Sequence, residues 1–68
     1  MDEEVFNLEV RKFLKKVGIQ SQREIEQAVH RNIEKGTLNV TKTLPASVVL
    51  RVPDVGVEVL IEGEIGMA

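Results

Sequence analysis

The side chains that could carry chemistry are few in this 68-residue chain. It has no cysteine and a single histidine, His30, which excludes disulfides, thiolate catalysis and multi-histidine or cysteine metal sites. Glu58, Glu62 and Glu64 alternate along a strand-like segment and could act as paired hydrolytic carboxylates or bind a cation. Because no further domain forms a cleft, we expect them only to keep a strand soluble. The sequence therefore predicts no catalytic residue, no cofactor, no metal ion and no enzymatic activity.

Basic residues form the second group, in the segment Arg11-Lys12-Phe13-Leu14-Lys15-Lys16. It could contact an acidic partner or anionic lipid, but its two apolar residues fit a core-facing stripe, so we expect an ordinary solvated helix face. The chain has 9 Lys and Arg against 11 Asp and Glu, a formal net charge of −2. Nucleic-acid binders normally show a surplus of positive charge, because counterion release supplies much of their affinity. Nucleic acid is not the expected partner.

The first residues are acidic and then basic, with no long apolar run. This pattern does not fit a signal peptide or a membrane span. We expect a cytoplasmic protein without a membrane partner.

Two helices are predicted for the first half of the chain. The apolar spacing of Phe6, Val10 and Val17 predicts a helix over about residues 3–17, which Gly18 would end. Ser21 and Glu24 match a capping box, so a second helix is expected over about residues 22–35, followed by Gly36. The apolar face of this second helix would be Ile25, Ala28, Val29 and Ile33.

Two strands are predicted for the second half, over about residues 47–52 and 57–65. They flank Pro53-Asp54-Val55-Gly56, a segment with strong turn chemistry. A register that pairs Val52 with Val57 makes one face of the hairpin wholly apolar. On the other face the pairs would be Arg51 with Glu58 and Val49 with Leu60. The expected fold is a single α+β domain over residues 1–68, in which a two-helix hairpin packs on a C-terminal antiparallel β-hairpin in the order α-α-β-β.

Residues 13–36 also raise the question of a DNA-binding helix-turn-helix. Such motifs place apolar residues about six and nine positions after the turn glycine, where this chain has Glu24 and Gln27. The apolar residues come one position later, so the turn is one residue too long and a plain αα-hairpin is expected. The alternative is a winged-helix-like nucleic-acid-binding protein that uses helix 22–35 and the 47–65 hairpin. Its reading face would offer Arg23, Gln27, His30 and Glu34.

Several segments are distinctive in combination: Phe6-Asn7, Arg11 to Lys15, Ser21 to Glu26, Leu44-Pro45-Ala46 and Gly63-Glu64-Ile65. Across nearly the whole chain they resemble a family of short uncharacterised proteins, a domain of unknown function found mainly in proteobacteria. The resemblance implies a bacterial, stand-alone small protein and implies no activity.

The most favoured function is a small non-enzymatic protein-interaction or regulatory module that forms a homodimer. A lone two-stranded hairpin is marginal in water and has two open edges, and apolar residues remain outside the predicted core faces. The alternative is that a short strand from Leu38 to Val40, or the connector, covers one edge, and that the outlying apolar residues are isolated. The candidate interaction residues are Leu8, Arg11, Lys15, Arg23, Gln27, His30, Val49 and Leu60.

Overall fold

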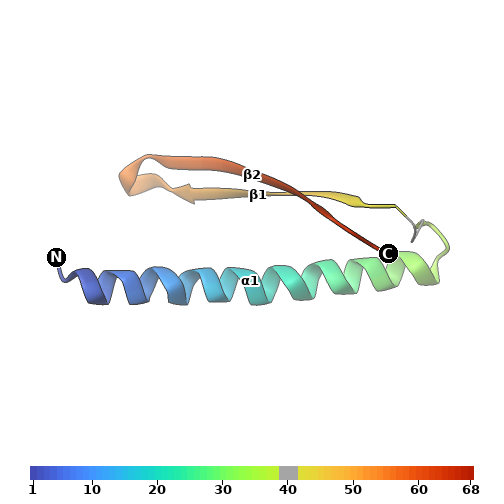
Figure 1. Cartoon of the computed structure of the whole chain (residues 1–68), viewed down its shortest axis with the longest axis horizontal. Helices are drawn as coiled ribbons and strands as arrows, with labels where there is room; N and C mark the ends of the chain where they lie inside the picture. Colours follow the sequence, from blue (N-terminus) through green and yellow to red (C-terminus); the bar gives the residue numbers. More distant parts are fainter. Residues whose placement is uncertain (39–41) are drawn as a thin grey trace. The chain divides into compact units, whose positions relative to one another are not determined.

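The computed structural model describes residues 1–38 and 42–68, which form one long helix and one β-hairpin (Figure 1). The elements are helix α1 (Glu3–Glu34), strand β1 (Leu44–Val52), the short 3-10 helix η1 (Pro53–Val55) and strand β2 (Val57–Ile65). The chain divides into a helical unit over residues 1–38 and a hairpin unit over residues 39–68.

The start of α1 is fixed by Asp2. Its side-chain oxygen Oδ1 accepts hydrogen bonds from the backbone N–H groups of Glu4, at 3.0 Å, and Val5, at 3.2 Å. These bonds satisfy two of the N–H groups that a helix start leaves without partners. Glu3 and Glu4 add negative charge to the first turn, where the helix dipole favours it.

The end of α1 is a Schellman motif around Gly36. The backbone N–H of Gly36 donates to the carbonyl of Ile33, and that of Thr37 donates to the carbonyl of Asn32, both at 3.0 Å. Gly36 has φ of +70°, a left-handed conformation that glycine adopts without a steric penalty. The Thr37 hydroxyl also bonds to Asn32 Oδ1 at 2.8 Å. The predicted stop at Gly36 is therefore confirmed.

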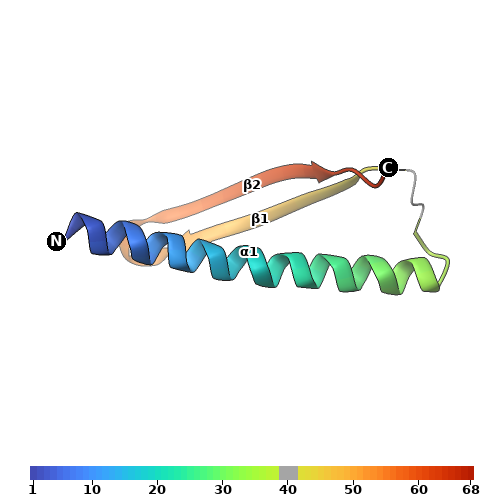
Figure 2. The same ribbon diagram turned by 60° about the horizontal axis from the view of Figure 1, so that its bottom comes forward.

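The prediction of two helices is wrong. A single helix of 32 residues runs through Gly18 and Ser21 without interruption (Figures 1 and 2). Gly18 does not have a positive φ, and a glycine inside a helix costs only about 1 kcal/mol relative to alanine. That cost is too small to break a helix whose neighbouring turns all form. The capping box is not used, because Ser21 lies in the interior of the helix.

The apolar pattern also continues across the expected break. Six positions along α1 follow one another in steps of three or four residues: Val10, Leu14, Val17, Ser21, Ile25 and Ala28. Five steps over 18 residues give the helical period of about 3.6 residues, so these positions share one face, called here the apolar stripe. Ser21 is polar but small, so it can lie within the stripe. The stripe therefore continues past Gly18 and Ser21 on a single helix.

The hairpin prediction is confirmed. β1 and β2 pair antiparallel from Leu44 with Ile65 to Val52 with Val57, and β1 begins three residues earlier than the expected residue 47. The turn closes where the Gly56 N–H donates to the carbonyl of Pro53 at 3.1 Å, with Gly56 at φ of +70°. The expected register is observed: Val48, Leu50 and Val52 pair with Ile61, Val59 and Val57 on one apolar face, called here the inner face. The longer strand β1 adds Leu44 and Ala46 to this face, opposite Ile65 and Gly63.

No described side chain is buried. Taken by itself, a lone helix has no interior, and a two-stranded sheet has none either. The expected two-helix hairpin does not form, because α1 is one continuous helix. The prediction of a single domain over residues 1–68 stays a prediction. The expected strand from Leu38 to Val40 falls largely on residues 39–41, which lie outside the described residues. No helix in the described part of the chain is long and apolar enough to cross a membrane.

Candidate interaction surfaces

A basic surface surrounds Ile19 on α1. Lys15 and Lys16 lie four and three residues before it and Arg23 lies four residues after it, which are the spacings of neighbours on a helix surface. Lys12 lies seven residues before it, two turns away on the same side of the helix. These five residues are called here the Ile19 patch. Their side chains, with Gln20 and Glu24, line an open hollow of about 480 Å³, and 51% of Ile19 is exposed. The patch is an apolar centre ringed by four cations.

The four charged residues of the Ile19 patch are all basic, but Glu24 also lines the hollow and Glu26 lies two turns after Ile19 on the same side of the helix. Residues 11–23 contain five basic and no acidic side chains. Like charges at helical spacing repel one another, and a patch of one sign attracts anionic groups over about 10 Å at moderate ionic strength. The Ile19 patch therefore fits an anionic surface that also offers an apolar contact.

The Ile19 patch lies opposite the apolar stripe. Val10 and Ala28 are each nine residues from Ile19, and nine steps of about 100° place them half a turn away around the helix. A partner that covers the apolar stripe consequently leaves the Ile19 patch open.

The hairpin also has two different faces. Its second face, called here the mixed face, carries Pro45, Ser47, Val49 and Arg51 of β1 and Glu58, Leu60, Glu62 and Glu64 of β2. Leu60 is 56% exposed and lies between Glu58 and Glu62 on its own strand. The Arg51 Nε donates to Glu58 Oε1 at 3.3 Å, which confirms the expected cross-strand ion pair. Both of its side chains are about two-thirds exposed, so the pair contributes little stability.

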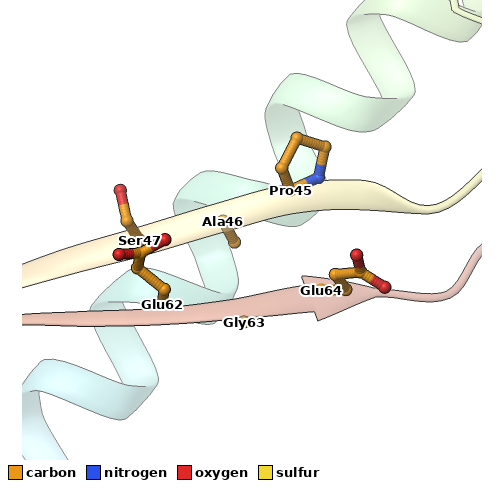
Figure 3. A pocket seen from close by; sticks show the side chains of 6 residues that line it. All are labelled: Pro45, Ala46, Ser47, Glu62, Gly63 and Glu64. Carbon is orange, nitrogen blue, oxygen red and sulfur yellow. The ribbon is translucent and has the colours of Figure 1, made fainter.

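The open end of the hairpin holds the remaining carboxylates of the mixed face. Pro45, Ala46, Ser47, Glu62, Gly63 and Glu64 line an open hollow of about 450 Å³. In Figure 3, Pro45 and Ser47 point to one side of β1 and Ala46 points to the other, with Glu62 beside Ser47. No group of three or more potential metal ligands occurs within residues 1–38 and 42–68. The hollow therefore adds the negative charge of Glu62 and Glu64 to the mixed face.

Because α1 is one continuous helix, the predicted contact residues on it can be compared by their angle around the helix axis from Ile19. Leu8, Lys15, Arg23 and His30 lie eleven, four, four and eleven residues from Ile19, within about 40° of it around the helix. Arg11 and Gln27 lie about 80° to either side. Val49 and Leu60 are cross-strand partners on the mixed face. The predicted residues thus fall on two surfaces.

Three members of the Ile19 patch were not among the predicted contact residues: Lys12, Lys16 and Ile19. Lys12 and Lys16 belong to the basic segment that the sequence predicts to be an ordinary solvated face, and the expected helix end at Gly18 separates Arg23 from these lysines. The sequence signal was the spacing of four cations around Ile19, which is readable only on one uninterrupted helix. The same continuity removes the winged-helix hypothesis, because helix 22–35 is not a separate element.

The sequence matches the family of unknown function DUF6494 over residues 1–68. The chain belongs to this family. Comparisons of this DUF6494 member with curated proteins and with solved structures gave no match. Its family membership therefore brings no activity, substrate or partner, and its function has to be argued from its own surfaces.

Proposed function

We propose that this chain is a small non-enzymatic interaction module that associates with a second copy of itself. The observation that carries the proposal is that no described side chain is buried, although the helix and the hairpin each present an apolar face. Apolar faces of this extent usually mark contacts with another protein. The absence of cysteine and the single histidine support a non-enzymatic role.

Association would supply the stability that each unit lacks. Most helical stability in proteins comes from packing of an amphipathic face, and a two-stranded hairpin alone is marginal in water. Burying one Val, Leu, Ile or Phe side chain contributes about 1.5 to 3 kcal/mol. Residues such as Phe13, at 50% exposed, and Ile61, at 54%, still have about half of their surface to bury, so each would contribute about half of this amount.

A second copy is the partner that the apolar faces support best. Two identical apolar faces complement each other across a two-fold axis, and the closed two-fold dimer is the commonest form of self-association. The hairpin adds a further reason, because within the described residues the sheet has only β1 and β2. Its outer edges are open to another strand.

The test is sedimentation equilibrium over a wide concentration range, with a variant that alters only the inner face of the hairpin. Val48 and Ile61 are cross-strand partners there, so Val48→Lys with Ile61→Glu places an ion pair in the apolar face and keeps the net charge. We expect the wild-type mass to rise above 7.6 kDa with concentration and the variant to associate much more weakly. The control, Val48→Ile with Ile61→Val, keeps the face apolar and should associate like the wild type. A wild-type monomer that persists at high micromolar concentration would overturn the proposal.

A further inference from the structure

We propose that the Ile19 patch of one copy docks on the mixed face of β2 in a second copy. The inference rests on the proposed function, because it takes the partner to be another copy of this chain, and it adds which surfaces meet. The surfaces are the four cations around Ile19 on α1 and the residues Glu58, Leu60, Glu62 and Glu64 on β2.

The two surfaces are complementary in composition. Ile19 is an exposed apolar residue within a ring of lysine and arginine, and Leu60 is an exposed apolar residue between two glutamates. Residues 11–23 carry five basic and no acidic side chains, whereas residues 44–65 carry one basic and four acidic side chains. Contact between the two surfaces would bring Ile19 against Leu60 and place the lysines and arginine beside the glutamates. Such complementarity accelerates encounter and disfavours wrong partners.

The two surfaces also match in length. Lys12 and Arg23 are eleven residues apart on α1, which is about 16 Å at the helical rise. Glu58 and Glu64 are six residues apart on β2, which is about 20 Å at the rise of an extended strand. A helix laid along β2 could therefore bring its cations alongside the three glutamates in one contact.

Both surfaces remain accessible when the apolar faces are covered. The Ile19 patch lies opposite the apolar stripe of α1, and the mixed face lies opposite the inner face of the hairpin. Every copy carries one patch and one mixed face, so a pair of copies offers two contacts of this kind, one in each direction. No third component is needed.

The experiment uses two charge-reversed variants of the full chain. One carries Lys15→Glu and Lys16→Glu, and the other carries Glu62→Lys and Glu64→Lys. Each variant alone should associate roughly tenfold or more weakly than the wild type, because its contacts become repulsive. Mixing the two variants should restore association as a 1:1 pair, because both exchanged contacts then join opposite charges. Native mass spectrometry and sedimentation velocity at low salt distinguish the pair from either variant alone.

A matched control reverses charge outside the patch. Arg31→Glu with Lys35→Glu makes the same change in net charge on positions about 120° and 160° around the helix from Ile19. This control should associate within about twofold of the wild type. A fourth variant, with all four reversals on one chain, should associate like the wild type. It keeps the test decisive if one of the two partly reversed variants fails to fold by circular dichroism.

The contrary outcomes separate this contact from the proposed function. Unchanged association of the reversed variants would overturn the docking and leave self-association through the apolar faces intact. If both variants lose association and mixing does not restore it, the docking is also overturned. A contact between two copies would be restored in the mixed pair, because the reversed surfaces then have opposite charges. Binding of random duplex DNA that Lys15→Glu with Lys16→Glu abolishes, with self-association unchanged, would identify a polyanion as the occupant instead. A wild-type monomer at all concentrations would overturn both proposals.

Discussion

The helix and the hairpin are both amphipathic, but the backbone hydrogen bonds within each of them span very different distances along the chain. Each backbone hydrogen bond of α1 links residues about four apart, whereas the strand pairing joins residues as distant in sequence as Leu44 and Ile65. A helix therefore depends on what each turn can tolerate, and a hairpin depends on one turn and one register. The consequence is that a weak defect such as Gly18 matters little in α1, whereas the pairing of both strands depends on the one turn around Gly56.

The two units also differ in how they distribute charge. α1 has six basic and six acidic residues, yet the basic residues of its middle turns form a surface of one sign. The hairpin has one basic residue, Arg51, against four acidic ones over residues 44–65. The net charge of −2 thus conceals a positive surface on one unit and a negative surface on the other. A small chain that is not basic overall can still present a basic site.

The largest expected effect comes from Gln22→Pro, which tests whether α1 is continuous. Proline in a helix interior removes a backbone hydrogen bond and clashes with the carbonyl four residues earlier, at a cost of about 3 kcal/mol. If a second helix began after Ser21, residue 22 would be its first position, where proline is well tolerated. We expect a clear loss of helical content by circular dichroism and of stability in urea.

Glu3→Pro is the matched control for this change, because Glu3 is the first residue of α1 after its cap Asp2. It should leave the helical content nearly unchanged. Equal and small effects of the two prolines would show that the helix is interrupted near residue 22.

The next effect tests the dependence of the hairpin on its turn. Gly56 has φ of +70°, and a β-branched residue is strongly disfavoured in this left-handed region. Gly56→Val should destabilise the hairpin by about 1 to 2 kcal/mol and speed amide hydrogen exchange in both strands. Gly56→Asn should cost less, because asparagine tolerates the left-handed conformation. Equal effects of valine and asparagine would mean that the turn does not fix the register.

The hairpin was readable from the sequence because several independent signals agreed. The turn residues, the alternation of apolar side chains and the pairing of Arg51 with Glu58 all require the same register. A slip of one residue would turn every side chain to the other face of the sheet. The sequence therefore predicted the pairing of the two strands correctly over its central residues.

The helical half was misread because two stop signals were given more weight than the period of the apolar residues. Gly18 and the Ser21 to Glu24 motif resemble a boundary, but each is worth only about 1 kcal/mol. The stripe from Val10 to Ala28 keeps helical spacing across both signals. The Ile19 patch was missed for the same reason, because it exists only when residues 12 and 23 lie on one helix.

The smallest predicted effect is the change in stability caused by Gly18→Ala. Its sign distinguishes one continuous helix from two helices joined at Gly18. No atom outside the helix's own nearby backbone lies within 4 Å of the position where a Cβ on Gly18 would be placed, so alanine fits there without a clash. In a continuous helix, Gly18→Ala should raise stability by about 0.5 to 1 kcal/mol, because alanine loses less conformational freedom on folding than glycine. If Gly18 formed a left-handed turn between two helices, the same change would lower stability, since alanine is strained at positive φ. Urea unfolding followed by circular dichroism measures the sign directly. Gly36→Ala is the control, because Gly36 does have positive φ, and it should lower stability under the same conditions.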